Sequence, residues 1–414
     1  METLRQTQGN WVSGPDRFYN RAHELRRFLE ILTGGGHVHL TAQRRIGKTS
    51  LMREAARRLG DRYSCVFVDV EDAASAEDFV AALAAQLWAD RKLLAKVGQV
   101  FRNVLEKTSE AVESLQVDEI AITIREGLLR GTWREKADRL MDEIAEAEPP
   151  VILFLDEVPV MVDRMLSGPN HEVTPEGRAA VDAFMSWLRR ATQRHQGKIR
   201  VVVTGSIGFE PILRRVGLSA TINHLAPFDL EPWPAKTAIG CLRALGNHYG
   251  LTFADGAAER MTERLGSCIP HHVQVFFGHV RDVVERDERD VCTVEDVEAA
   301  YRKRMLGPRG HVELSTYEER LSRVLPKDVL ALAIDLLTEA AVTGTLHGST
   351  VPVFLRDHDL AGAEGEASAR SVLDVLEHDG YLTRDGASYA FESSLLRDWW
   401  RRRHGDTFTP ASGR

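Results

Sequence analysis

Apolar positions in the first 230 residues alternate between two patterns. Short uninterrupted apolar runs predict buried strands, and apolar residues spaced three and four apart predict helices between them. The runs predict strands at 38–42, 65–70, 151–155 and 201–203. Because they are apolar throughout, both faces of each strand should be covered. This order of elements predicts an α/β fold, with a parallel sheet between two layers of helices.

The helical patterns extend the prediction to the rest of the chain. Helices are expected at 22–32, 48–59, 75–94 and 178–195, with a charged helical insertion at about 90–148. After about residue 234 strands should disappear, and helices continue to about 307. The stretch 307–315 is predicted to be a linker. Helices at 317–337 and 367–378, followed by a hairpin around Asp385-Gly386, predict a C-terminal winged helix.

Three domains follow from these patterns: a core at 1–233, a helical lid at 234–307 and a winged helix at 315–406. A chain of 414 residues, 43% hydrophobic and 28% charged, suits two or three globular domains. The net charge of -8 limits contact with nucleic acid to a local basic patch.

The composition also bears on location and metals. The first residues contain no apolar segment and no run approaches about 18 apolar residues, so a cytoplasmic protein without membrane spans is expected. The cysteines lie far apart and form no C-x-x-C pair, which predicts buried thiols in a reducing compartment and no cysteine metal site. They are Cys65, Cys241, Cys268 and Cys292.

The stretch after the first strand fits the phosphate-binding pattern G-x-x-x-x-G-K-[ST], except that Ala42 stands for the first glycine. Backbone N–H groups of such a loop point at phosphates, where the helix dipole favours anions. Lys48 should reach the β and γ oxygens, and Thr49 should offer a hydroxyl to Mg²⁺. Gly47 should allow close approach to the phosphates. The predicted nucleotide-binding residues are Ala42, Gln43, Arg44, Arg45, Ile46, Gly47, Lys48, Thr49 and Ser50. The alternative is a strand–turn–helix with a chance G-K-T.

An acidic pair ends the strand at 151–155 and supports the nucleotide site. This buried strand should deliver Asp156 to the carboxyl edge of the sheet, where it can hold Mg²⁺. Glu157 is then placed to polarise the attacking water. The alternative is two solvated acids. At the end of another strand, Ser206 is predicted to contact the γ-phosphate or the water, with a helix N-cap as the alternative.

On these residues the chain resembles the AAA+/STAND ATPases, in the archaeal-type branch found in bacteria and archaea. "RFYNRAHEL" resembles the box that opens such domains, with Asn20 in place of glycine, a residue that tolerates left-handed backbone. The resemblance implies that Phe18, Tyr19 and Arg21 lie near the adenine and that Ser206 is the sensor-1 position. Relatives often have the sequence "APRRIGKTSL" at the loop, so Ala42 is a familiar variant and Gln43 is the residue that differs from the relatives.

The lid departs from the family at the position of its sensor-2 arginine, where this chain has Pro270-His271-His272. This resembles the G-x-P signature of STAND proteins, which implies that Pro270 lines the adenine pocket. The missing arginine argues against rapid, ring-coupled hydrolysis. For the two histidines, the alternative is a pair of partly exposed residues at a helix start.

Two groups of arginines have a functional and a structural interpretation. Near the C-terminus a basic patch beside Trp399 and Trp400 predicts contact with DNA phosphates. The alternatives are aromatic core packing under a solvated face and contact of the patch back onto the ATPase domain. The patch consists of Arg397, Arg401, Arg402 and Arg403. After the sensor strand, Arg214 and Arg215 are candidates for an arginine finger that completes the site of a neighbouring subunit. The alternative is that they are two surface arginines on a short helix.

The sequence therefore predicts an ATP-binding, ATP-hydrolysing molecular switch that uses Mg²⁺. Its nucleotide state should control how the winged helix docks, and so which DNA, protein partner or further copy of the chain it binds. One alternative is a DNA-binding initiator or regulator similar to archaeal origin-recognition ATPases. Another is a scaffold that holds nucleotide with little hydrolysis.

Overall fold

The computed structural model describes residues 3–6, 11–89, 133–168, 172–360 and 362–413, and it forms two compact units. We call Arg21–Ala42 with Leu51–Leu230 the sheet unit. The helical unit comprises Met1–Asn20, Gln43–Ser50 and Glu231–Arg414. The predicted phosphate-binding loop therefore groups with the helical unit. The predicted domain boundaries remain predictions.

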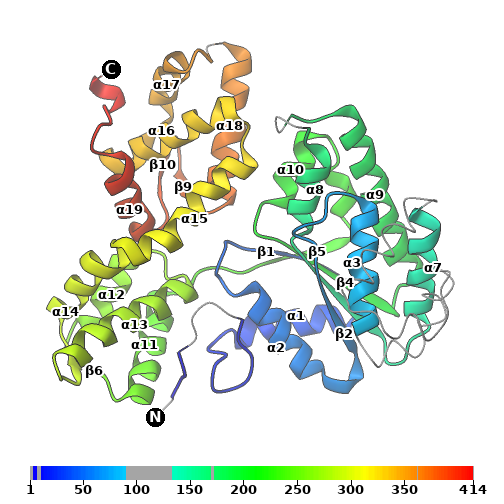
Figure 1. Cartoon of the computed structure of the whole chain (residues 1–414), viewed down its shortest axis with the longest axis horizontal. Helices are drawn as coiled ribbons and strands as arrows, with labels where there is room; N and C mark the ends of the chain where they lie inside the picture. Colours follow the sequence, from blue (N-terminus) through cyan, green and yellow to red (C-terminus); the bar gives the residue numbers. More distant parts are fainter. Residues whose placement is uncertain (1–2, 7–10, 90–132, 169–171, 361, 414) are drawn as a thin grey trace. The chain divides into compact units, whose positions relative to one another are not determined.

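The sheet unit is built on five parallel strands in the order β2-β3-β4-β1-β5 (Figure 1). The strands are β1(His37–Thr41), β2(Ser64–Asp69), β3(Val151–Asp156), β4(Ile199–Thr204) and β5(Leu225–Asp229). The parallel sheet and four of its strands were predicted. The fifth, β5, was not, because its apolar run is interrupted by Pro227, a residue that suits only an edge strand.

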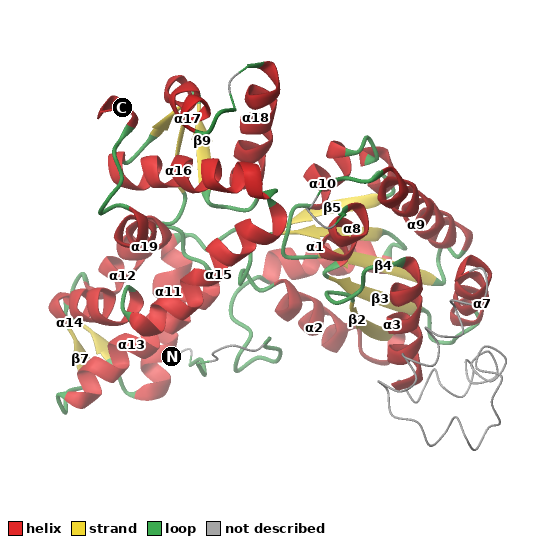
Figure 2. Cartoon of the chain, turned by 45° about the horizontal axis from the view of Figure 1, so that its top comes forward, coloured by secondary structure: helices red, strands yellow, loops and turns green. Residues whose placement is uncertain are grey.

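Helices cover both faces of this sheet, as Figure 2 shows. Successive side chains of β3 point to opposite faces. Leu153 joins the core formed with α3(Ala76–Ala89), α7(Trp133–Ala145), α8(Val158–Leu166), α9(Pro175–Arg194) and α10(Phe209–Arg215). On the other face Phe154 stacks on Phe67, 4.6 Å between centroids, and Arg53 of α2(Lys48–Leu59) covers Phe67 at 3.6 Å. The helix α1(Ala22–Thr33) contributes Phe28 against Phe228. The uniformly apolar strands thus reflect burial on two sides.

Most of the predicted helical insertion lies outside the described residues, which stop at 89 and resume at 133. Its described end is α7, which packs on α9 in the sheet unit. Trp187 of α9 donates a hydrogen bond from Nε1 to Asp138 Oδ1 at 2.8 Å, which anchors the two helices to one another.

The first half of the helical unit spans the residues predicted to form a lid, and we call it the lid. Its helices are α11(Ala235–Tyr249), α12(Ala257–Leu265), α13(Pro270–Arg286) and α14(Val294–Ala300), followed by the π-helical segment η3(Tyr301–Met305). The expectation that strands disappear after residue 234 was wrong. Two short parallel strands, β6(Thr252–Phe253) and β7(Val291–Cys292), pair here. Each has only two residues, too few for an apolar pattern to mark it.

The second half contains α15(Pro308–Val324), α16(Lys327–Thr343), α17(Val351–Asp357), α18(Ala363–His378) and α19(Ser394–His404). The predicted linker at 307–315 is wrong, because α15 begins at Pro308, and proline suits the first position of a helix. The single helix predicted at 317–337 is two, separated at Pro326.

The predicted hairpin at Asp385-Gly386 is present in this half. It joins β9(Leu382–Asp385) to β10(Ser388–Phe391), and Gly386 has a φ of 59°. The strand β8(Leu346–His347) adds to β10 and completes a three-stranded antiparallel sheet. A hairpin that follows helices is consistent with a winged helix, and that assignment remains a prediction.

One hydrophobic core runs through the helical unit from α11 to the C-terminal end. Trp399 and Trp400 of α19 are buried in it, and Trp400 Nε1 donates to Thr338 Oγ1 of α16 at 3.1 Å. Tyr381 donates from its hydroxyl to the carbonyl of Tyr317 at 2.8 Å. The lid and the C-terminal half therefore share their core.

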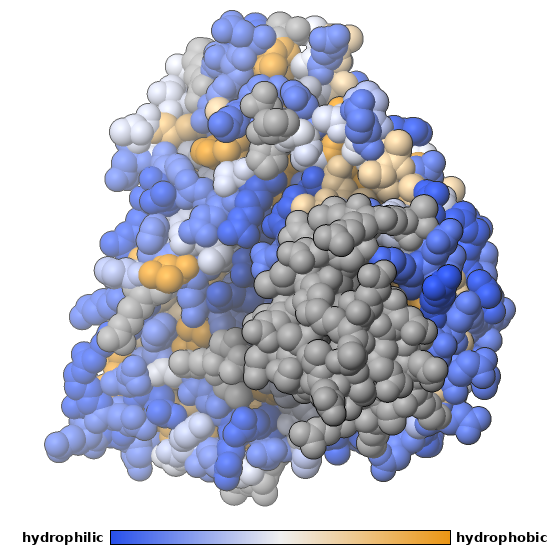
Figure 3. Space-filling view, turned by 45° about the vertical axis from the view of Figure 1, so that its right-hand side comes forward, coloured by the Kyte–Doolittle hydropathy of each residue, from blue (hydrophilic) through white to orange (hydrophobic). Residues whose placement is uncertain are grey.

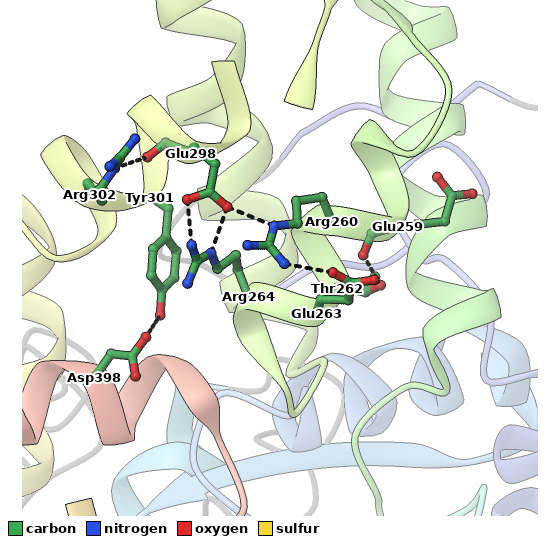
Figure 4. A network of polar contacts seen from close by, with 9 residues as sticks. All are labelled: Glu259, Arg260, Thr262, Glu263, Arg264, Glu298, Tyr301, Arg302 and Asp398. Atoms are coloured by element: carbon green, nitrogen blue, oxygen red, sulfur yellow. Dashed lines mark hydrogen bonds and ion pairs between the residues drawn. The ribbon is translucent and has the colours of Figure 1, made fainter. Parts of the chain in front are cut away.

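A polar network joins the same two halves (Figure 4). Glu298 of α14 accepts hydrogen bonds from Arg264 at 2.8 and 2.5 Å and from Arg260 at 2.7 Å, both on α12. Nearby, Tyr301 donates from its hydroxyl to Asp398 Oδ2 of α19 at 2.9 Å. Three segments of the lid and the last long helix are thus tied by charge-assisted bonds, which are stronger than neutral ones.

Glu298→Gln is expected to lower the free energy of unfolding by about 2 kcal/mol at pH 7, because Arg264 and Arg260 lose a charged partner. The hydrogen bond from Arg264 lowers the pKa of Glu298 from 4.5 to about 2. The stabilisation is therefore present above pH 4.5 and is lost as the pH falls towards 2. Chemical denaturation of parent and variant should differ at neutral pH and converge near pH 2. The control is Glu295→Gln, an exposed acid on the same helix; an equal loss in the control contradicts the assignment.

The described surface is largely hydrophilic. The face in Figure 3 shows mainly blue residues with scattered hydrophobic groups. The large hydrophobic residues that are exposed in the described ranges are Trp11, Val173, Val291 and Val312. Within the same ranges, no helix combines the length and the apolar character needed to cross a bilayer.

Candidate functional site

The strand order places the candidate loop at a topological switch point. From β1 the chain passes to β2 at the far end of the sheet, whereas the strands beside β1 are β4 and β5. In open α/β sheets, ligands bind at the carboxyl ends of the strands where the connections diverge in this way. The loop 43–47 leaves the carboxyl end of β1 and leads into α2, so its position in the topology is that of a phosphate-binding loop.

The backbone of the loop has the conformations that such a turn needs. Gly47 has a φ of 103°, a region that other residues avoid, and Arg45 also has a positive φ, of 65°. Ala42 is not among the described residues with positive φ, so its methyl group is tolerated where the pattern has glycine. Lys48 is buried and its Nζ donates to the carbonyl of Gln43 at 3.1 Å. The lysine side chain thus curls back over its own loop.

Close approach of the Gly47 backbone to phosphates stays a prediction. A Cβ at this position would have no atom within 4 Å, so the protein itself leaves space there. The positive φ of Gly47 is by itself a reason for glycine at this position.

Arg45 connects the loop to the lid within the helical unit. Its Nη1 lies 2.6 Å from Nε2 of His271 at the start of α13 and 2.9 Å from Oε2 of Glu313 on α15. The hydrogen bond from His271, together with the positive charge of Arg45, lowers the pKa of Glu313 to about 2. At neutral pH the loop is therefore held by an ionised carboxylate that lies 268 residues further along the chain.

Gln43 connects the same loop to the C-terminal half. Its Nε2 donates to Glu392 Oε2 at 2.5 Å, next to the hairpin. Gly380 faces the same side chain, since a Cβ there would lie 2.2 Å from Gln43 Nε2. Only glycine at 380 allows this approach. Burial raises the pKa of Glu392. Sequence analysis missed Glu313, Glu392 and Gly380, and no local pattern marks them.

At the carboxyl end of β3, Glu157 is bound to the end of β4. Its Oε2 accepts hydrogen bonds from the backbone N–H of Ser206 at 2.8 Å and from Ser206 Oγ at 2.9 Å. Gly205 permits this contact, because a Cβ there would come 2.6 Å from Pro159. Ser206 is not a helix N-cap, since α10 begins at Phe209 and its N-cap is Gly208. The proposed general base and the proposed sensor therefore contact one another directly.

The backbone at Glu157 helps to aim this carboxylate. Glu157 has a φ of 61°, which is rare for a residue with a side chain, and it precedes α8 as the N-cap residue. Its N–H donates to Asp156 Oδ1 at 3.1 Å. Backbone strain of this kind clusters at functional sites, where it sets a side chain in place.

The residues expected to hold Mg²⁺ supply suitable oxygen atoms. Mg²⁺ on a nucleotide is usually bound by one or two protein oxygens, with phosphates and water completing the shell. Thr49 in the first turn of α2 carries a hydroxyl oxygen and Asp156 at the end of β3 carries a carboxylate. Their chemistry fits such an ion, and their role as ligands stays a prediction. Across the described ranges, no group of three or more His, Cys, Asp or Glu side chains could hold a metal ion.

The residues expected near the adenine differ in their burial and in the residues that they contact. Asn20 has a φ of 59°, as predicted for the position where the family has glycine. Tyr19 packs edge-on against Trp233 at 5.7 Å within the helical unit. Arg21 is buried and pairs with Glu24 at 2.8 Å in the sheet unit. Phe18 is partly exposed, and Pro270 is the first residue of α13.

The alternative for the two histidines after Pro270 holds for His271, which is partly exposed at the start of α13, and is wrong for His272, which is buried. His271 contacts Arg45 and Glu313, as described above. His272 is buried, and burial lowers its pKa to about 3, so its ring is neutral at physiological pH.

The candidate finger arginines form ion pairs within the sheet unit. Arg214 pairs with Glu210 at 2.7 Å and keeps an exposed side chain. Arg215 pairs with Asp163 at 3.0 Å. A role in a neighbouring subunit remains a prediction.

The C-terminal basic patch lies over a packed aromatic core. Trp399 and Trp400 are buried, as the core-packing interpretation requires. Arg397 pairs with Asp398 at 2.9 Å, Arg403 pairs with Glu318 at 2.5 Å, and Arg402 donates to the carbonyl of Leu306 at 3.2 Å. Arg401 is exposed. Contact of the four arginines with DNA remains a prediction.

Residues 38–218 match the family model of the ATPase family associated with various cellular activities (AAA). This part of the chain is therefore similar to an AAA ATPase domain. The match runs from β1 to the segment after α10, and so includes the loop, the acidic pair and Ser206. Sheet order and family match together establish the AAA P-loop NTPase fold.

Solved structures give the same fold. The chain is similar to the Walker-type ATPase paby2304 of Pyrococcus abyssi, with 15% identity, a TM-score of 0.64 and coverage of 95% of this chain and 98% of that one. It is also similar to the ORC2 protein of Aeropyrum pernix, described in ADPNP-ADP complexes, with 12% identity, a TM-score of 0.54 and coverage of 96% and 97%. No curated protein sequence matches the chain.

Proposed function

We propose that this protein is an ATP-binding and ATP-hydrolysing molecular switch whose nucleotide state controls how its C-terminal half docks. The observation that carries the proposal is the pair of contacts made by the AAA domain's phosphate-binding loop. Arg45 binds Glu313, and Gln43 binds Glu392, all within the helical unit. A phosphate that enters the loop competes with these contacts, because it draws the same backbone and side chains towards itself.

The proposed chemistry assigns one role to each residue of the site. Lys48 leaves the carbonyl of Gln43 and binds the β and γ oxygens. Thr49 and Asp156 hold Mg²⁺, which neutralises charge on the phosphates when bound. Glu157 accepts the proton of the attacking water once Ser206 turns its hydroxyl to the γ-phosphate or the water. Because Glu157 must first leave Ser206, turnover is slow.

The shared core of the helical unit supports coupling of nucleotide to the whole C-terminal half. Since the lid and that half are packed as one body, a shift at His271 or Glu313 is transmitted to α19. The partner that responds is DNA, a protein or a second copy of the chain, and Arg397, Arg401, Arg402 and Arg403 remain its proposed contact if it is DNA.

Glu313→Gln tests the switch without replacing any residue of the loop. The variant should release a fluorescent ADP analogue several-fold faster or slower than the parent, because Arg45 loses the charge that fixes the loop to α15. Stopped-flow dissociation measures the rate. The control is Glu318→Gln on the same helix, whose carboxylate pairs with Arg403 and does not contact the loop. Equal release rates in parent, variant and control would remove the loop contacts from the switch.

A further inference from the structure

One nitrogen atom of His271 lies within reach of two partners that make opposite demands on it. Its Nε2 is 2.6 Å from Nη1 of Arg45 and 3.2 Å from Oε2 of Glu313, all within the helical unit. A guanidinium group only donates hydrogen bonds, so the contact with Arg45 requires a bare Nε2 that accepts. An ionised carboxylate only accepts, so the contact with Glu313 requires a hydrogen on Nε2. The two bonds therefore exclude one another.

A proton on the ring of His271 decides between these two arrangements. A neutral imidazole that carries its hydrogen on Nδ1 accepts from Arg45, which at the same time donates to Glu313 at 2.9 Å. In the protonated ring both nitrogen atoms are donors. Nε2 then donates to Glu313, and it meets the guanidinium of Arg45 with an N–H group and a second positive charge. Arg45 therefore loses its contact with the ring.

Several charged or titratable groups surround this contact. They lie on the loop, on α13 and on α15 and are Arg44, His272, His279, Arg281, Asp282 and Tyr317. The pKa of Glu313 is lowered to about 2, so this carboxylate stays ionised. Burial lowers the pKa of His272 to about 3 and raises the pKa of Tyr317, so both groups stay neutral. Histidines change charge between about pH 5 and 8, which leaves His271 and His279 to be distinguished by experiment.

We propose that His271 is a proton-sensitive positioning residue for the phosphate-binding loop, which holds Arg45 while it is neutral and releases it when it is protonated. This rests on the proposed nucleotide site and adds a means of regulating it. Arg45 lies inside the loop with a φ of 65°, so its side-chain contact bears on the backbone that phosphate must meet. Because phosphate competes with the contacts of Arg45, a fall in pH should strengthen nucleotide binding. By reciprocity, bound nucleotide should promote uptake of a proton at His271.

The first test needs no nucleotide. Nuclear magnetic resonance of the full chain with ¹⁵N-labelled histidine and arginine should show a bare Nε2 and a hydrogen on Nδ1 of His271 at pH 8. The signals are assigned by their loss in His271→Gln and in Arg45→Lys. As the pH falls, protonation of His271 and a shift of the Arg45 guanidinium signals should follow one titration curve. A hydrogen on Nε2 at pH 8, or Arg45 signals that ignore the titration, would overturn the proposal.

The second test measures the affinity for ADP by calorimetry at pH 8 and pH 6. Glutamine at position 271 can accept from Arg45 through its side-chain oxygen but takes up no proton. Parent and His271→Gln should therefore bind ADP alike at pH 8, and the parent should bind about fivefold more tightly than the variant at pH 6. Protonation of ADP itself affects both chains equally, so it cancels in this comparison.

The matched control is His279→Gln. His279 is on the same helix, is also partly exposed, and lines a cavity together with Glu313. This control should keep the pH dependence of the parent. The proposal is wrong if parent and His271→Gln share one pH profile, or if His279→Gln removes the dependence instead. A parent chain that binds no ADP at either pH would refute the nucleotide site, while the resonance experiment would still decide whether His271 controls Arg45.

Discussion

Lys48→Ala is expected to weaken ATP binding by about 100-fold, close to 3 kcal/mol. Lys48 is the lysine of the loop, its side chain is buried, and its ammonium group donates to the carbonyl of Gln43. Alanine removes the charge that the β and γ oxygens need, while backbone N–H groups remain. Equilibrium titration with a fluorescent ATP analogue measures the loss.

The control for this variant is Lys236→Ala. Lys236 is an exposed lysine in the first turn of α11, so it matches the position in a helix but not the loop. It should bind ATP like the parent. If Lys48→Ala also binds ATP like the parent, with an unchanged melting temperature, the loop does not hold phosphates and the assignment is wrong.

Glu157→Gln is expected to keep ATP bound and to slow hydrolysis by about 10²–10⁴-fold, the usual contribution of a general base. Glutamine can still accept a hydrogen bond from Ser206, so the ends of β3 and β4 should stay together. It cannot take the proton of water. Single-turnover hydrolysis with the enzyme in excess separates this chemical step from nucleotide release.

Glu176→Gln provides the comparison for the chemical step, since Glu176 is an exposed acid in the first turn of α9. Its turnover should equal that of the parent. Turnover of Glu157→Gln within twofold of the parent would place the general base elsewhere. Loss of ATP binding in the same variant would mean that Glu157 maintains the fold of the site.

Local sequence patterns were sufficient to predict those elements whose structure depends on residues within one short segment. The apolar runs identified four strands because burial on both faces leaves no polar positions. The glycine and lysine pattern located the loop because the left-handed φ of Gly47 is a local property. The acidic pair after β3 was found for the same reason, since the end of a buried strand is visible as a change from apolar to charged residues.

The same reasoning failed where local signals were weak. The strand β5 was not predicted because Pro227 interrupts its apolar run. The residues Gly307-Pro308-Arg309-Gly310 were interpreted as a linker, although α15 begins at Pro308. Both errors arose because glycine and proline are read as loop residues, whereas packing against neighbouring elements can accept them in an edge strand or a first helical turn.

The sequence by itself determined four of the five parallel strands, the position of the loop with the phosphate-binding pattern, the acidic strand end and the terminal hairpin, since each depends on residues a few positions apart. Only the tertiary structure decided what holds the loop. Glu313 and Glu392 reach Arg45 and Gln43 across 268 and 349 residues, and Ser206 reaches Glu157 across 49. Such pairs leave no periodic pattern in a single chain, because chain folding alone brings their atoms within hydrogen-bonding distance.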